Sequence, residues 1–366
     1  MRNYIIQRVI WIFIILISTL TITFVLLKSA PEYPPPKTED KDVWLERQVM
    51  DGYYLKEYYP DTEEGRAQVE AIRTEYVDSL DRTVFVVQPI DDSTVHKVFY
   101  RVPIIEQYFK WARNVLFDWN WGTSTTIAQN QPAFGIIASR IPLTLSLNVF
   151  VLLFYIPFGF LFGILAALKK DTVVDNLMQV FIMFFLSLPS LVFILLLIII
   201  FSYQMNDFLP ALFPLLARQE GWDLAKGYII PVVASGLPAV AGFTRMLRAE
   251  LSEVLTSDFV LLAKTKGLSH SQAVIRHAIR NSLVPMIPII IGSFAGLLSG
   301  SFIMEKVYAV PGVGSITLRA LTQGAYDYNV LMSSSAFYGV IALVTVLIVD
   351  LSYGIIDPQI RMGARK

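Results

Sequence analysis

Long uncharged apolar runs, separated by shorter polar segments, set the pattern of this chain. None of the runs contains Asp, Glu, Lys, Arg or His, and a helix needs roughly 17–25 residues to cross the hydrocarbon core of a bilayer. Each run reaches that length, the fourth only just, so the pattern predicts an all-α integral membrane protein with six transmembrane helices. The runs cover residues 9–27, 141–168, 177–206, 228–244, 282–304 and 330–349.

The first run could also belong to a secretory signal peptide, because Arg2 and Arg8 precede it. The apolar part of a signal peptide has about 7–15 residues and leads to a cleavage site with small residues. This run is longer and no clean site follows it. We therefore interpret residues 1–29 as an N-terminal region with a retained first helix.

Orientation can be predicted from basic residues, which gather in short cytoplasmic loops. With the N-terminus inside, six crossings place the most basic short loops inside, so we expect both termini in the cytoplasm. The basic residues then inside are Lys169, Lys170, those of segment 245–280, and Arg361, Arg365 and Lys366; those in the short outside loops are Arg218, Lys226, Lys306 and Arg319.

Residues 30–140 are then expected to be extracytoplasmic. The proline-rich stretch "APEYPPPK" ends the first helix. Apolar residues at helical spacing in "DTEEGRAQVEAIRTEYVDSLDR" predict an amphipathic helix, and "TVFVV" and "HKVFY" predict short strands. No carboxylate pair, Ser–His arrangement or metal-ligand cluster stands out between about 31 and 100, so we interpret that part as an inserted cap rather than a catalytic domain.

The stretch "PIIEQYFKWARNVLF" follows from Pro103 and predicts an amphipathic helix in the membrane interface. Aromatic side chains in and after it suit the interfacial belt. These are Tyr108, Phe109, Trp111, Trp119 and Trp121.

Composition narrows the chemistry. Only 16% of the residues are charged, against about a quarter in soluble domains. The absence of cysteine excludes disulfides and thiol catalysis, and no phosphate-binding loop of the form G-x-x-x-x-G-K-[ST] occurs. Ion-coupled carriers generally need ionisable residues inside their spans, and the six runs have none. We expect no enzymatic activity, no metal or cofactor on this chain and no nucleic-acid partner; a partner protein should supply the energy.

A basic segment, residues 261–285, lies between the fourth and fifth runs. Asp258 or Ser257 can cap a helix over residues 259–266, and Gly267 suits a left-handed end to it. Ser269 can cap a second helix that reaches about Arg280. Two short helices at an angle could dock on a soluble partner and transmit rigid-body motion. An ordinary basic loop on the cytoplasmic side is the alternative.

The stretch "DFVLLAKTKGLSHSQAVIRHAIRNSLVP" resembles the cytoplasmic signature loop of binding-protein-dependent ABC importer permeases, in its peptide-permease form. It departs from that pattern at Leu262, Lys264 and Thr265, where the family has Thr, Arg and Ala, and Leu261 replaces a leading Glu. The matching positions are Val260, Ala263, Lys266, Gly267, Leu268, Arg276, His277, Ala278, Asn281, Leu283 and Pro285.

Three further stretches resemble the same family, in the same order along the chain. "WNWGTSTTIAQNQPAFGIIASRIPLTLSL" resembles the segment before the second helix, and "DLSYGIIDPQIR" resembles the end, with Gln359 for Arg. "VYAVPGVGSITLRALTQGAYDYNVL" resembles a loop with P-G-x-G and R-D-Y-P, in which Tyr326 and Asn329 replace Arg and Pro. The resemblance covers residues 1–29 and about 100–366 and does not explain the insertion.

The resemblance implies a type I ABC importer permease of the oligopeptide and dipeptide B-type subfamily in a bacterial cell membrane, with a permease core at 141–366. It implies these partners: a second similar permease, two cytoplasmic ATPases that bind ATP and Mg, an external substrate-binding protein and a peptide substrate. The helix bundle itself is expected to contact membrane lipid. It assigns coupling to the ATPases to loop 245–281. The coupling candidates are Ala263, Lys264, Lys266, Gly267, Leu268, Arg276, His277 and Asn281.

Two other features are candidate functional elements. Pro311 and Gly312 suit the centre of a type II turn, with Gly314 and a helix from Ser315 to about Gln323 after it. With Asp327 these residues are candidates for a gate at the outer mouth, a plain surface turn being the alternative. In the fifth run, three glycines spaced by four residues favour close helix packing. They are Gly292, Gly296 and Gly300.

The substrate is expected to be an oligopeptide, and dipeptides, nickel chelates and glutathione remain open as alternatives. A rival of another class is a membrane receptor or scaffold that uses residues 31–100 for recognition. A secondary carrier is a further rival, which the uncharged runs disfavour.

Overall fold

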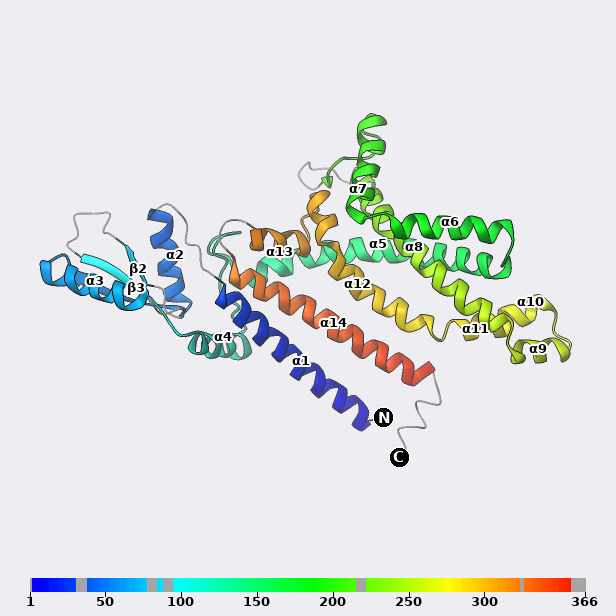
Figure 1. Ribbon diagram of the computed structural model, residues 1–366, viewed down its shortest axis with the longest axis horizontal. Helices are drawn as coiled ribbons and strands as arrows, with labels where there is room; N and C mark the ends of the chain where they lie inside the picture. Colours follow the sequence, from blue (N-terminus) through cyan, green and yellow to red (C-terminus); the bar gives the residue numbers. More distant parts are fainter. Residues whose placement is uncertain are drawn as a thin grey trace. The chain divides into compact units, whose positions relative to one another are not determined.

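The computed structural model describes residues 2–30, 38–77, 84–87, 95–214, 222–322 and 326–356 (Figure 1). The chain forms two compact units. The first unit consists of Met1–Phe13, Arg140–Ser315 and Tyr338–Lys366, and the second unit of Ile14–Ser139 and Ile316–Phe337. Four helices contribute residues to both units: α1 (Arg2–Ser29), α5 (Ala133–Leu168), α13 (Val313–Thr322) and α14 (Tyr328–Ile356). The tail cations at 361, 365 and 366, and Arg218, fall outside the described residues.

The described residues contain four helices that are long and apolar enough to cross a membrane alone: Ile6–Ser29, Ala133–Leu168, Trp222–Leu255 and Tyr328–Ser352. Two bent pairs, Val173–Ser187 with Ser190–Gln204 and His270–Ser282 with Met286–Ser293, raise the number to six if each pair is one span. The predicted all-α membrane fold is confirmed. The predicted fifth span corresponds to α12 (Met286–Val307), which has 22 residues.

The third predicted span is not one straight helix but a bent pair of helices. Helix α6 (Val173–Ser187) is followed by α7 (Ser190–Ile198) and a π-helical turn (Ile199–Gln204), with a bend of 98° between them. Leu188 has an extended backbone, as a residue before a proline prefers, and Pro189 starts the next helix. The proline therefore explains the position of the break.

The first unit is built on α5 and on α8 (Trp222–Leu255). Their contact is close because a Cβ at Gly159 would lie 2.7 Å from the Phe243 ring, and one at Gly163 would lie 2.9 Å from Leu247. An ion pair also joins α6 to α8, since Arg248 donates to both carboxylate oxygens of Asp175 at 2.6 Å. Beyond α8 come α9 (Asp258–Thr265), α10 (His270–Ala273), a π-helical turn (Val274–Ala278) and α11 (Ile279–Ser282).

The second unit contains the inserted segment, which folds as a small α/β layer. Helices α2 (Thr38–Met50) and α3 (Glu63–Val77) accompany a three-stranded antiparallel sheet of order β1-β3-β2. The strands are β1 (Tyr54–Pro60), β2 (Val84–Val87) and β3 (Val95–Arg101). The predicted helix and both predicted strands are confirmed. We call this layer, from α2 to β3, the insert. Its core consists of Trp44, Leu45, Tyr53, Tyr54 and Phe99.

The predicted interfacial helix forms as α4 (Ile104–Asp118), but two of its expected belt residues are buried. Trp111 packs against Phe24 of α1 with ring centroids 5.2 Å apart, and Trp121 stacks on Phe134 at 5.7 Å. Only 6% of Trp111 and 5% of Trp121 is exposed. The belt assignment is therefore wrong for these two tryptophans, which are core residues of the second unit.

Candidate functional site

The basic segment folds as two short helices joined by a tight left-handed turn, as the sequence predicted. Gly267 has a φ of +91°. Its backbone N–H donates to the carbonyl of Lys264, and the N–H of Leu268 donates to that of Ala263. These two bonds define a Schellman motif, which satisfies carbonyls that the helix end leaves free. We call residues 258–282 the coupling element.

The second helix of the coupling element begins at a complete capping box. The Ser269 hydroxyl accepts from the backbone N–H of Gln272, whose side chain accepts in turn from the backbone N–H of Ser269. Ser257 occupies the corresponding position before α9, but its hydroxyl donates to the carbonyl of Val254 instead of capping. The junction between the helices therefore has a defined geometry from residue 263 to residue 272.

Buried side chains, most of them small, hold the coupling element against α5 and α8. They form one cluster across α5, α8, α9 and the second helix, with Leu268 packed against it, and comprise Ala167, Leu251, Val260, Ala263, Ala273 and Ala278. The four alanines of this cluster let the backbones of the helices approach closely. Of the predicted coupling residues, Ala263 and Leu268 thus belong to the attachment rather than to a free surface.

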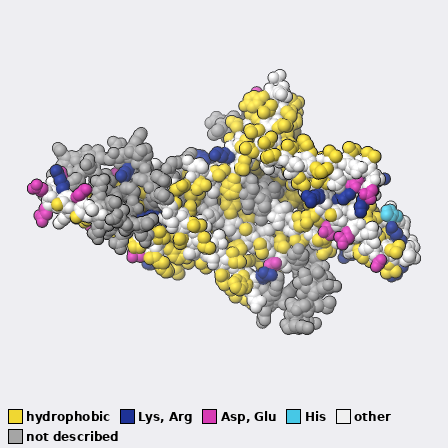
Figure 2. All heavy atoms as spheres, in the orientation of Figure 1, with side chains coloured by type: hydrophobic (Ala, Val, Ile, Leu, Met, Phe, Trp, Pro, Cys, Tyr) yellow, Lys and Arg dark blue, Asp and Glu magenta, His cyan; other side chains and the backbone are white. Residues whose placement is uncertain are grey.

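The opposite face of the coupling element is exposed and both basic and apolar. The predicted residues on it are Lys264, Lys266, Gly267, Arg276 and Asn281, with His277 half-buried. Figure 2 shows basic side chains and a histidine close together in the part of the first unit where α9 and α10 lie. Four large apolar side chains that the sequence reasoning did not select are exposed beside them: Phe259, Leu261, Leu262 and Ile275. The sequence indicates them only through helical spacing, which puts them on a different face of the helix from the buried Val260 and Ala263.

Two of the gate candidates in the first unit, Gly312 and Gly314, pack around a buried carboxyl group, that of Glu305. Thr144 donates to one oxygen of Glu305 at 3.1 Å, and the backbone N–H of Ser315 donates to the other at 2.8 Å. The N–H of Val313 donates to the Thr144 hydroxyl. These acceptors start α13 at Val313, two residues earlier than predicted, and the carboxyl oxygens of Glu305 lie at its N-terminal end.

The predicted type II turn at Pro311 and Gly312 does not form. A type II turn needs a positive φ at its third residue, and Gly312 does not have one. Glycine fits there because a Cβ would lie 2.5 Å from the Glu305 carboxylate and from the Thr144 hydroxyl. A Cβ at Gly314 would lie 3.0 Å from the same carboxylate. Gly312 and Gly314 are thus packing positions around Glu305.

Asp327, the fourth gate candidate, is a fully buried anchor in the second unit. One of its oxygens accepts from the Ser124 hydroxyl at 2.6 Å and from the backbone N–H groups of Thr125, Thr126 and Ile127 at 3.0–3.2 Å. The other accepts from the N–H of Val330 in the first turn of α14. The carboxylate therefore sits in a concave nest of backbone donors and caps a helix at the same time.

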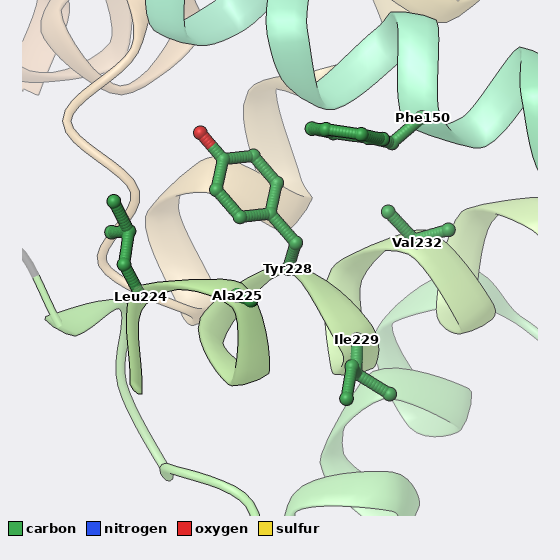
Figure 3. Close-up of a pocket in the computed structure, with 6 residues that line it drawn as sticks. All are labelled: Phe150, Leu224, Ala225, Tyr228, Ile229 and Val232. Carbon is green, nitrogen blue, oxygen red and sulfur yellow. The ribbon is translucent and has the colours of Figure 1, made fainter. Parts of the chain in front are cut away.

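The glycines of the fifth span stay a prediction. Among the described residues, a Cβ at Gly292 would meet no atom within 4 Å beyond the backbone of its own helix. Gly296 and Gly300 lie in the part of α12 whose side-chain surroundings fall outside the described residues. An apolar groove of about 530 Å³ lies elsewhere in the first unit, between α5 and α8. Figure 3 shows Phe150 of α5 and Tyr228 of α8 near each other, with ring centroids 5.1 Å apart, and Val232 on the same side of α8 as Tyr228.

Comparison with known proteins identifies the chain. The profile of the family described as "Binding-protein-dependent transport system inner membrane component" matches residues 159–362. The chain belongs to this family. The permeases of this family are inner-membrane components of ABC transporters, which work in general with a second permease, ATPases and a substrate-binding protein.

Named relatives are peptide permeases. Dipeptide transport system permease protein DppB of Lactococcus lactis is 35% identical over 71% of this chain and 82% of its own length. Oligopeptide transport system permease protein OppB of Haemophilus influenzae is 33% identical over 71% and 81%. DppB of Bacillus subtilis is 29% identical over 71% and 80%. The expected family, membrane location and transport function are confirmed, and both dipeptide and oligopeptide permeases occur among the relatives.

Proposed function

We propose that this chain is one of two permease subunits of an ATP-driven importer of short peptides, and that the coupling element docks on a cytoplasmic ATPase. The observation that carries the proposal is the coupling element itself, because it combines a fixed backbone junction, a close attachment to α8 and an exposed apolar and basic face. Both termini then lie in the cytoplasm, and the insert lies outside.

In the proposed cycle, ATP closes the two ATPases and the coupling element follows them. Exposed Leu262 and Ile275 fit a groove on the partner, and Lys264, Lys266 and Arg276 fix the register by charge. The motion passes through the buried cluster around Leu251 into α8. Alternating access then follows from rigid-body movement of packed helices.

ATP and Mg are held by the partner ATPases in this proposal. The chain has no phosphate-binding loop, and among the described residues no group of three acidic or histidine side chains is placed to hold a metal. The purified chain should therefore hydrolyse no ATP. Robust hydrolysis by this subunit, with contaminating ATPases excluded, would contradict the assignment.

The proposed substrates are short peptides, because relatives are named for both dipeptide and oligopeptide transport. The test is ATP-dependent uptake into vesicles that contain the chain with the second permease, the ATPases and the binding protein of its own system. Labelled dipeptides, pentapeptides, a nickel chelate and glutathione are compared at equal concentration. Uptake of a peptide supports the proposal. Uptake of only the chelate or only glutathione would show that the proposed substrate class is wrong. Binding of a ligand without any uptake would favour a receptor.

The orientation is tested separately with a protease added to spheroplasts. Cleavage within the insert, while the coupling element remains intact until the cells are lysed, is the expected result. A protected insert together with an accessible coupling element would reverse the proposed topology without affecting the family assignment.

A further inference from the structure

The insert is fastened to the start of α14 through one side chain, Asn329. Its amide nitrogen donates to a carboxylate oxygen of Asp51 at 3.1 Å and to the carbonyl of Thr123 at 2.8 Å. Its amide oxygen lies 3.4 Å from the hydroxyl of Tyr53, which donates to it. Only 3% of Asn329 is exposed. The amide therefore joins the insert, the loop after α4 and the first turn of α14 at one buried point.

A second set of contacts fastens the insert to the end of α1. The Lys28 ammonium lies 3.7 Å from the centre of the Tyr53 ring and 4.4 Å from that of Tyr328. Such contacts are strongest where water is excluded, and only 1% of Lys28 is exposed. Arg101, at the end of β3, donates to the backbone carbonyl of Lys28. Tyr53, before β1, and Arg101, at the end of β3, thus both contact the C-terminal end of α1.

These contacts leave little freedom between the parts they join. Tyr53 belongs both to the core of the insert and to the contact with Asn329 and Lys28. Gly122 packs directly under the Asn329 amide, so that a Cβ there would overlap it. Arg47 of α2 adds a hydrogen bond to the carbonyl of Ser124 at 3.1 Å. A cap attached only through a flexible linker would need none of these hydrogen bonds and packing contacts.

The charges in the contact depend on one another. Burial raises the pKa of Asp51 above its ordinary value, while the hydrogen bond from Asn329 and the charge of Lys28 act in the opposite direction. Removing either partner leaves a buried polar group without its counterpart, which is more costly than never having made the bond. Asp51 and Asn329 are therefore expected to act as a pair.

We propose that the insert is a fixed part of the translocating unit: Asp51, Tyr53 and Asn329, with Lys28, form an insert clamp that keeps the first turn of α14 and loop 122–127 on the insert throughout the transport cycle. The clamp residues are positioning residues for α14, not substrate-binding ones. This inference rests on the proposed function, because a transport cycle is needed for the clamp to matter.

The test uses the absence of cysteine from the chain. The pair Asp51→Cys and Asn329→Cys removes the clamp, and a short bifunctional thiol reagent then restores a covalent link at the same place. Peptide uptake, normalised to the amount of permease in the membrane, should fall by roughly fivefold or more with free thiols, return when the link forms, and fall again when a reducible link is cleaved. The pair Lys97→Cys and Asp42→Cys, which removes a half-buried ion pair within the insert, is the matched control and should transport normally in every state.

Three results would overturn the inference. Normal uptake with free thiols would show that the clamp is unnecessary, a link that blocks uptake or fails to restore it would show that the insert must separate, and thiols that cannot be linked would contradict their contact. Asp51→Ala, Asn329→Ala and the double variant form a second test, since the double variant should lose little more uptake than either single one. Absence of uptake by the unaltered chain with its full set of partners would instead refute the proposed function.

Discussion

Replacement of Gly267 by valine tests whether the geometry of the coupling element matters. The residue has a φ of +91°, in the left-handed region, and a Cβ there would meet no atom of the described residues within 4 Å. Gly267→Val therefore introduces no clash, and its entire effect comes from the backbone. A β-branched residue is strongly disfavoured in this region.

The magnitude follows from that backbone preference. An L-residue held in the left-handed region costs about 1–2 kcal/mol, which changes a two-state population by a factor of roughly 5–30. The valine variant must either accept this strain or open the two Schellman hydrogen bonds and change the angle between the helices. In both cases fewer molecules present a correctly aligned face to the ATPase. The buried cluster beneath is untouched, so abundance in the membrane should stay normal.

Three quantities should be measured together for each variant: membrane abundance, recovery of the ATPases on purification, and ATP-driven uptake. We expect uptake by Gly267→Val to fall by roughly 5–30-fold at normal abundance. Gly267→Asn should be milder, because asparagine tolerates the left-handed region. Full uptake by the valine variant would refute the reasoning and reduce the segment to an ordinary basic loop.

Two further substitutions test the buried carboxylates by the melting temperature of the purified complex. Gly312→Ala should lower the stability of the complex by about 1–3 kcal/mol, because its Cβ would lie 2.5 Å from Glu305. Gly135→Ala is the control and should be neutral or slightly stabilising, because the nearest atom to its Cβ lies at 3.7 Å. Equal melting temperatures of the two variants would contradict this packing. Asp327→Asn should destabilise by about 1–3 kcal/mol, because an amide can accept on only one side while backbone donors face both oxygens. Exposed Asp118→Asn is its control, and a similar small effect of both would argue against the nest.

The features that could be predicted from the sequence are those with local causes. The break at Gly267 and the cap at Ser269 each depend on hydrogen bonds that span no more than five residues, and both are confirmed. The membrane spans follow from apolar length alone. The bend in the third span also has a local cause, Pro189, whose effect was hidden by the unbroken apolar pattern around it.

The buried carboxylates could not be predicted, because their partners are remote in the sequence. Thr144 and Glu305 are 161 residues apart, and Ser124 and Asp327 are 203 apart. A glutamate at the end of an apolar span is typical of an interfacial residue, and nothing near it in the sequence indicates that it accepts from the start of α13. The sequence predicts a turn at Gly312 that does not form. A sequence alone does not distinguish a glycine that is needed for its φ from one that is needed because it has no side chain.

The insertion and the unusual Asn329 have a single physical explanation. In the sequence they are two unrelated departures from the pattern that this chain otherwise resembles: an extra segment of about 31–100, and asparagine where that pattern has proline. A proline at 329 would offer no side-chain donor or acceptor, and so could bond neither Asp51 nor Tyr53. An asparagine in a chain without the insert would leave buried donors without those partners. In this structure the insert and Asn329 are joined through these bonds, and the insert clamp is therefore expected to fail when either side is changed alone.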